Sequence, residues 1–237
     1  MGLLKEIQKG IRLFNHLLPY AAGDFVLCKV FQRDPRNRHE RPVVLSMRIE
    51  AIIFIFQAMR QKPSSKTRSN LTKRNEFSRY YWKLFEYNKR EPYEFCEDQR
   101  EKITQAFNEI HSRLVKSLKV AGYHGPQRRF PTFASKLLHC SFPKAFPIRD
   151  TQSLNRMSSV AKRNGFCLSR NYLDHEYAGV VDFYLILGKK LERSYGSRVK
   201  EQLVEYDYSS QPVPESLKVR NTWLRAIDKW LWLKGQR

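Results

Sequence analysis

The sequence predicts a mostly α-helical fold of about eight helices. Apolar residues recur at three- and four-residue spacing through most of the chain, which is typical of helices that bury one face. No series of alternating strands and no internal repeat accompanies this pattern. With 237 residues, 41% of them hydrophobic, the chain is long enough to bury a core in one unit, with two helical lobes and a linker near 60–72 as a variant.

The first half of the chain carries three of the expected helices. Residues 3–18 place apolar side chains at helical spacing and end before a proline. Residues 43–59 are apolar on nearly all sides, and their length favours a buried central helix over a strand. Residues 72–88 start at a threonine cap and are rich in aromatic side chains, of which Trp82 and Phe85 are expected in the core.

The second half carries the others. Residues 97–120 show the clearest amphipathic pattern, because one stripe collects Ile103, Phe107, Ile110, Leu114 and Leu118. A short helix is expected at 132–140, and a helix at 151–163 should stop at an Asn-Gly pair. Longer helical segments at 172–194 and 215–233 complete the chain.

The charge of the chain is far from balanced. The 44 Lys and Arg residues outnumber the 23 Asp and Glu residues, and the formal net charge is +21. This excess opposes compaction and close self-association, so a polyanionic partner is the physical reason to carry it. Because the basic residues are spread along the chain, we expect a monomeric folded domain with a basic face that binds nucleic acid. A membrane-surface protein is the competing class, but no long basic amphipathic segment supports it.

Several other classes are disfavoured. The apolar run at 51–59 is too short to cross a bilayer and the N-terminus has no signal-peptide pattern, so a cytoplasmic protein is expected. The four cysteines are too far apart for a zinc site or a disulfide framework. Phosphate loops, nucleophile elbows and metal-binding His pairs are absent, so neither cofactor nor metal is expected. The one local acidic group is Asp174, Glu176 and Asp182, which are expected on a solvated or core-bordering helix face.

One aspartate stands in an unusual place. The stretch FASKLLHCSFPKAFPIRDTQS, residues 133–153, sets Asp150 after two prolines and before a helix start. Asp before Thr-Gln-Ser is an ordinary N-terminal helix cap. A carboxylate at a helix N-terminus is also held in its charged form, and it can stabilise positive charge that develops on a substrate. The two roles are compatible. His139 in the same stretch is expected to be a core or surface residue, not a ligand.

This stretch resembles the segment of helix-hairpin-helix DNA glycosylases that leads from the hairpin to the catalytic aspartate. In that family a short helix of the form K-x-A-x-x-x-L runs into a loop that ends Pro-Val-Asp, and a new helix starts beside the Asp. The matching residues here are Ala134, Leu137, Leu138, Phe146, Pro147, Ile148 and Asp150. The stretch is also similar to bacterial phage-defence glycosylases that remove glucosylated hydroxymethylcytosine from phage DNA.

The chain departs from the family at the hairpin. The family reads Leu-Pro-Gly-Val-Gly there, and the backbone amides of the hairpin hold a DNA phosphate. This chain keeps Gly122 and Gly125, but the spacing to Asp150 is a few residues longer. The resemblance therefore implies a remodelled hairpin, in which Arg128 and Arg129 supply the phosphate contacts.

The resemblance also implies an activity. Bifunctional members carry a nucleophilic lysine two residues before the helix alanine, where this chain has Thr132. Lys136 lies one turn further along and is expected to face elsewhere, among the DNA contacts. The implied protein is a monofunctional, cofactor-free DNA N-glycosylase of the bacterial cytoplasm, with Asp150 as its catalytic residue and double-stranded DNA with modified bases as its partner. Such enzymes flip the base out of the duplex, and the candidates for the base pocket are Tyr80 and Tyr81.

Further DNA contacts are expected near Asp150 from basic and amide side chains, namely Lys144, Arg149, Gln152, Asn155 and Arg156. Two other functions stay open. One is a non-catalytic DNA-binding module on a similar scaffold. The other is an RNA-directed protein with stacking aromatic side chains and a basic groove.

Overall fold

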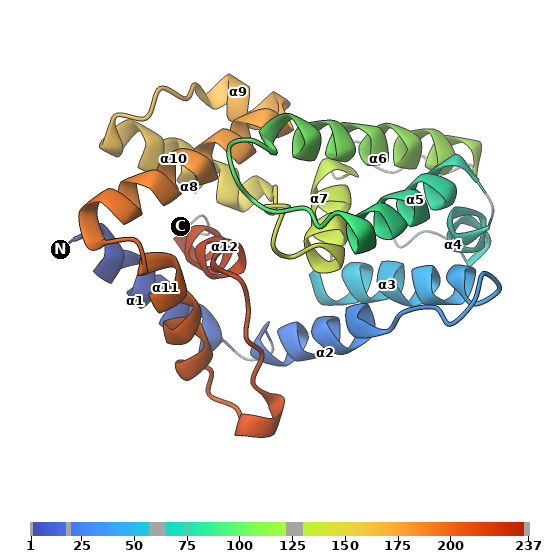
Figure 1. The fold of residues 1–237 in the computed structure, drawn as a ribbon, viewed down its shortest axis with the longest axis horizontal. Helices are drawn as coiled ribbons and strands as arrows, with labels where there is room; N and C mark the ends of the chain where they lie inside the picture. Colours follow the sequence, from blue (N-terminus) through green and yellow to red (C-terminus); the bar gives the residue numbers. More distant parts are fainter. Residues whose placement is uncertain (1, 18–19, 57–64, 74, 122–129, 235–237) are drawn as a thin grey trace.

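The computed structural model describes residues 2–17, 20–56, 65–73, 75–121 and 130–234. Within these ranges the chain is helical and has no strand, which confirms the predicted mostly α fold (Figure 1). A short 3₁₀ helix, η2, covers Glu215–Leu217. The α-helices are α1 (Leu3–Asn15), α2 (Tyr20–Gln32), α3 (Arg41–Phe56), α4 (Ser65–Thr72), α5 (Glu76–Arg90), α6 (Arg100–Val120), α7 (Phe130–Ser141), α8 (Thr151–Asn164), α9 (Arg170–His175), α10 (Tyr177–Tyr195), α11 (Val199–Ser209) and α12 (Trp223–Lys234).

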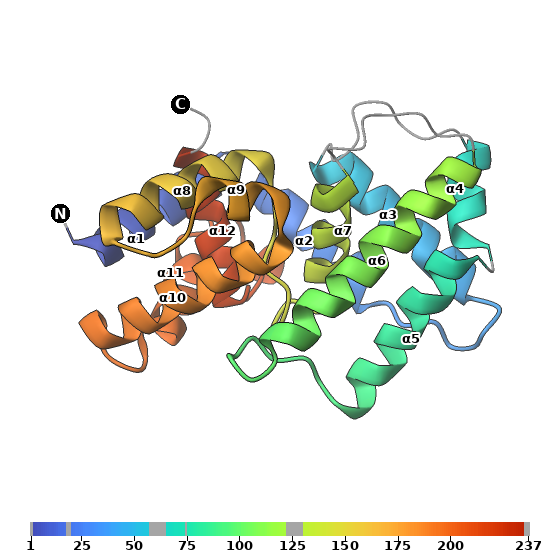
Figure 2. The same ribbon diagram turned by 90° about the horizontal axis from the view of Figure 1, so that it is seen from above.

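The helices form two groups that lie side by side (Figure 2). In one group, α2 to α7, helix α3 packs on α2, α4 and α7, and α6 packs on α4, α5 and α7. In the other group, α1 and α8 to α12, helix α12 packs on α1, α8 and α11. The chain thus starts in the second group, enters the first after α1 and returns between α7 and α8.

Helices α6 and α10 make a contact between the two groups. Arg100 Nη2 of α6 donates to Asp182 Oδ2 of α10 at 2.7 Å, and the Tyr172 hydroxyl donates to the same oxygen at 3.0 Å. Asp182, whose side chain is 20% exposed, therefore borders the core, which is one of the two surroundings expected for it. It ties α9 and α10 to the start of α6.

Several helices begin and end where local chemistry requires. Helix α5 starts later than the predicted threonine cap, because the Asn75 side chain accepts a hydrogen bond from the Ser78 amide at 2.7 Å. Helix α8 stops at Gly165, whose φ of 68° places it in the left-handed region that glycine adopts freely. The predicted segment 172–194 divides at Glu176, where an extended backbone (φ −119°, ψ 130°) separates α9 from α10.

Besides α4, which occupies part of the predicted linker, two helices were not expected. Helix α2, with the sequence YAAGDFVLCKVFQ, carries apolar residues on most sides, so no one-sided period marks it. Helix α11, VKEQLVEYDYS, is polar and buries only Val199, Leu203 and Asp207. The sequence patterns of these two helices are weak, and contacts with neighbouring helices stabilise them instead.

The predicted lobe linker near 60–72 lies partly outside the described residues. Its remainder forms α4, which packs against α3, α5 and α6 inside the first group. The described helices change group between α1 and α2 and between α7 and α8. The division of the chain into two helical lobes stays a prediction. No helix in the described ranges is long and apolar enough to cross a membrane.

Where α2 meets α11 and α12, five ionisable side chains form a buried charge cluster, defined as Asp24, Asp207, Arg225, Asp228 and Lys229. Arg225 Nη2 lies 2.7 Å from Asp24 Oδ1, and Lys229 Nζ lies 3.0 Å from Asp24 Oδ2. Lys229 Nζ also lies 2.8 Å from Asp207 Oδ1. Burial alone would raise the pKa of Asp24, but Arg225 and Lys229 outweigh it and lower that pKa to about 2. The cluster therefore binds the two groups through charges that satisfy one another.

His139 of α7 lies in the core, as expected. Its Nδ1 lies 2.7 Å from the carbonyl oxygen of Phe146, and only 4% of the residue is exposed. Since a carbonyl only accepts, Nδ1 carries the proton and Nε2 is an acceptor. Burial lowers the pKa of His139 from 6.5 to about 4, so the ring is neutral at pH 7.

The lowered pKa of His139 predicts a pH dependence of stability. His139 binds a proton near pH 6.5 in the unfolded chain but only near pH 4 in the folded chain. Its contribution to the free energy of unfolding is therefore fully present above pH 6.5 and is lost as the pH falls to 4. The loss is about 3 kcal/mol, because one pKa unit corresponds to about 1.4 kcal/mol. Urea unfolding measures the free energy of unfolding of wild type and of His139→Asn above pH 6.5 and at pH 4, and so checks this prediction. The asparagine amide replaces the Nδ1 donor but does not titrate, so an equal pH dependence in both proteins would contradict the assignment.

Candidate active site around Asp150

Asp150 lies at the N-terminus of α8, at the end of the segment that brings the chain back to the second group. Pro143 and Pro147 lack the amide hydrogen that a helix would use, and the chain stays non-helical up to Asp150. Its backbone is extended (φ −120°, ψ 140°), and its Oδ1 accepts a hydrogen bond from the Gln152 amide at 2.9 Å. The predicted helix cap at Asp150 is confirmed.

Lys136 of α7 forms an ion pair with Asp150. Its Nζ lies 2.7 Å from Asp150 Oδ2, and the side chains are 6% and 13% exposed. The expectation that Lys136 faces elsewhere, toward DNA, is therefore wrong. Nearly every residue of α7 from Phe130 to His139 is buried, so its sequence gives no one-sided pattern from which the direction of Lys136 could be read.

Arg149 supports the same segment from inside. Its amide donates to Ser135 Oγ at 3.0 Å, and its carbonyl oxygen accepts from that hydroxyl at 3.1 Å. Its guanidinium donates to the backbone carbonyl of Asp174, and burial lowers the pKa of Arg149. With 9% of the residue exposed, Arg149 positions the loop before Asp150 and offers little surface to a phosphate.

The other expected DNA contacts differ in exposure. Lys144 and Asn155 are exposed, and Asn155 Oδ1 accepts from Arg170 Nη2 at 3.3 Å. Arg156 is turned inward, where it pairs with Glu6 of α1. Gln152 is partly exposed, but its Oε1 is buried and accepts no hydrogen bond from the part of the chain that the structure describes. Gln152 is also the residue whose backbone amide donates to the capping carboxylate of Asp150.

The two base-pocket candidates lie in different surroundings. Tyr81 is fully buried, and its hydroxyl lies 2.7 Å from Arg48 Nη1 and 2.8 Å from Ser141 Oγ. It has no exposed face to offer a base and belongs to the core with Trp82. Tyr80 is partly exposed, and the Arg113 guanidinium lies 4.7 Å from its ring centre. Of the pair, Tyr80 alone keeps a face toward solvent.

The remodelled hairpin cannot be compared with the expectation. Gly122, Gly125, Arg128 and Arg129 lie outside the described residues. The described chain resumes at Phe130, the first residue of α7 and six residues before Lys136.

The site continues inward into the buried charge cluster. Ser153 of α8 donates to Asp228 Oδ1 at 3.4 Å, and Arg225 Nη1 lies 2.5 Å from Asp228 Oδ2. Burial raises the pKa of Asp228; Arg225 and Lys136 oppose this rise, and Asp150 adds to it. Asp228 is therefore close enough to sense both members of the Asp150 ion pair. No sequence signal linked these residues, because α12 is more than seventy residues from α8's start.

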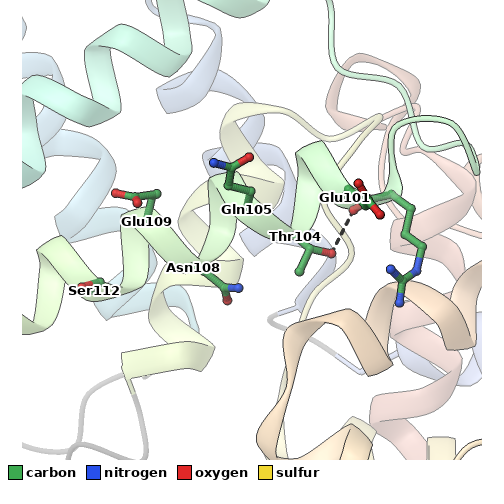
Figure 3. A pocket seen from close by; sticks show the side chains of 7 residues that line it. Glu101, Thr104, Gln105, Asn108, Glu109 and Ser112 are labelled. Atoms are coloured by element: carbon green, nitrogen blue, oxygen red, sulfur yellow. Dashed lines mark hydrogen bonds between the residues drawn. The ribbon is translucent and has the colours of Figure 1, made fainter.

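Other hollows belong to different surfaces. A hollow of about 490 Å³ runs along α6 and is lined by Arg100, Glu101, Thr104, Gln105, Asn108, Glu109 and Ser112 (Figure 3). All of these residues come from one helix, so within the part of the chain that the structure describes no second element completes a site there. In the described ranges, no group of three or more His, Cys, Asp or Glu side chains is arranged to hold a metal ion.

Comparison of the chain with family models, with curated proteins and with solved structures found no match.

Proposed function

We propose that the protein is a monofunctional DNA N-glycosylase of helix-hairpin-helix architecture with a remodelled hairpin. The observation that carries the proposal is the position of Asp150. Its carboxylate caps α8, faces Lys136 of α7, and lies where the chain passes between the two groups of helices. The expected substrate is double-stranded DNA with a modified cytosine, such as glucosylated hydroxymethylcytosine of phage DNA. The expected setting is the bacterial cytoplasm.

The chemistry requires one well-placed anion. Cleavage of an N-glycosidic bond builds positive charge on the deoxyribose, and a fixed carboxylate stabilises that charge and orients the attacking water. The free amides at the start of α8 and the Lys136 ammonium both favour the charged carboxylate. Both contacts stabilise the anion that the proposed chemistry requires.

Lys136 acts in this proposal as a positioning residue. An ammonium that donates to a carboxylate has no lone pair with which to attack the sugar. The 2.7 Å contact also holds Oδ2 of Asp150 in one place. Base removal would then leave an intact abasic site, without a covalent intermediate on lysine.

DNA would be attracted by the net charge of +21 and held by exposed side chains along α8 and in the segment before it. Lys144, Asn155, Lys162 and Arg163 are exposed and suit this role. Buried Arg149 and half-buried Arg156 would instead support the protein surface beneath the DNA. Because like charge opposes self-association, we propose that the protein acts as a monomer.

An assay for abasic sites tests the proposal. The protein is incubated with a duplex that contains glucosylated hydroxymethylcytosine and with a plain duplex of the same sequence, and both are then treated with hot alkali. Strand breaks are expected at the modified positions only. If both duplexes are bound and neither breaks, the enzyme proposal fails.

A second function is favoured by the burial of Asp150. Only 9% of this residue is exposed, and a cap with an ion pair explains its presence without catalysis. The protein would then be a non-catalytic DNA- or RNA-binding module. Competition between duplex DNA and structured RNA of equal length would separate these two ligands.

Borohydride treatment during the reaction tests the role of Lys136. A lysine that attacked the sugar would form an imine, and reduction would bond the protein covalently to DNA. We expect no such product on denaturing gels, because Lys136 is engaged with Asp150. A covalent product that disappears in Lys136→Gln would show a bifunctional enzyme and contradict the monofunctional proposal.

A further inference from the structure

A second cavity is lined by residues of α2, α7, α12 and the segments next to α7 and α12, and Asp150 is not among them. Its volume is about 340 Å³, within the range of sites that hold small molecules. Leu27, His139 and Arg225 form its buried floor, and Phe31 is half-buried in its wall. Gln32 and Arg220 are exposed at its mouth, so the cavity opens to solvent.

The charges that line this cavity are already satisfied. Asp24 Oδ1 accepts from Arg225 Nε at 3.2 Å and from its Nη2 at 2.7 Å, and Asp24 Oδ2 lies 3.0 Å from Lys229 Nζ. Arg220 at the mouth pairs with Glu205. Burial raises the pKa of Cys140 to about 12, so its thiol is neutral. An ion that entered would therefore meet no unmatched charge, and the cavity suits a neutral molecule.

Two hydrogen-bond acceptors in the cavity are not used. His139 carries its proton on Nδ1, so Nε2 is an acceptor, and nothing in the described part of the chain donates to it. Asn221 donates through Nδ2 to Asp207 Oδ2 at 2.8 Å. No group in the described part of the chain donates to its Oδ1. His139 is nine-tenths buried, but its Nε2 keeps some contact with solvent in the cavity, so a ligand that donates a hydrogen bond can reach it.

We propose that this cavity is a second ligand site, which binds a neutral, flat heterocycle with N–H donors, of the size of a free nucleobase. The Phe31 ring and the Leu27 side chain would contact the faces of the heterocycle. His139 Nε2 and Asn221 Oδ1 would accept its N–H groups. The site does not depend on base excision at Asp150.

Calorimetric titration of the whole protein without DNA tests the site, with uracil and cytosine as probes. Both are expected to bind saturably, with Kd below about 1 mM. 1,3-Dimethyluracil has the same ring without N–H donors, and its binding is expected to be at least about tenfold weaker, since the acceptors would stay unpaired. If neither base saturates, or if the methylated probe binds as tightly, the proposal is overturned.

Variants assign the binding to this cavity. Val219 lines it, and its amide and carbonyl are held by the Gln211 side chain at 2.9 and 2.7 Å, so Val219→Trp should fill the cavity from a fixed position. We expect at least about tenfold weaker binding of uracil. Leu217→Trp is the matched control, because Leu217 is 39% exposed and lies outside the lining, and it should bind as wild type does.

Two further measurements keep the outcomes separate. His139→Asn removes the Nε2 acceptor, keeps a donor for the Phe146 carbonyl and should also weaken binding, which covers the case in which Val219→Trp does not fold. Unchanged binding in every folded variant would overturn the site. Asp150→Asn should leave uracil binding unchanged, so failure of this site and failure of the glycosylase proposal are distinguishable.

Discussion

Replacement of Lys229 by methionine is expected to lower the free energy of unfolding by about 3–5 kcal/mol, the usual cost of breaking a buried ion pair. Lys229 is fully buried, and its Nζ donates to Asp207, Asp24 and Asn15 Oδ1, the last at 2.9 Å. Methionine has a similar volume but cannot balance the two carboxylates. The carboxylates of Asp24 and Asp207 would stay buried without the Lys229 ammonium that pairs with both of them.

Urea denaturation followed by circular dichroism measures this loss. Lys189→Met is the matched control, because Lys189 is also a helical lysine in an ion pair, with Glu97, but is 49% exposed. Its effect should be small, since solvent screens an exposed pair. If Lys229→Met were as stable as Lys189→Met, the buried charge cluster would not be what holds α2 to α11 and α12.

Asp150→Asn is expected to lower the rate of base excision by about 100- to 1,000-fold, the effect of removing one electrostatic group aimed at developing charge. Asparagine keeps the shape of the side chain and caps helices as well as aspartate does, so α8 should keep its start. The affinity for modified duplex should therefore stay close to that of wild type.

Single-turnover rates with excess protein give this comparison without interference from product release. Asp174→Asn is the control, because Asp174 is a partly exposed aspartate of α9 whose carboxylate pairs with Arg170. It should excise the base at the wild-type rate. An Asp150→Asn protein that does the same would leave Asp150 as a helix cap only.

Local patterns predicted much of the fold. The one-sided stripe of α6, the cap at Asp150 and the glycine at the end of α8 each follow from residues within a few positions of one another. Helix α2 was missed because it is apolar on most sides, and α11 because it buries few residues. Both depend on contacts with distant helices, which periodicity does not record.

The candidate site was predicted in part for the same reason. Asp150 stands at a helix start that is visible in the sequence, whereas its partner Lys136 lies fourteen residues earlier on a helix buried on nearly all sides. Tyr81 looked like a stacking residue by its type, but the fold buries it beside Arg48. The buried charge cluster joins residues up to about two hundred positions apart, and only the tertiary structure brings them together.

The central claim is that Asp150, held by α8 and Lys136, removes a base from modified DNA. Mass spectrometry of the small molecules released from a duplex with glucosylated hydroxymethylcytosine tests it most directly. The claim predicts the free glucosylated base in amounts that match the abasic sites formed, with none from plain duplex. Fully bound DNA that keeps every base, under conditions in which the protein is folded, would contradict it.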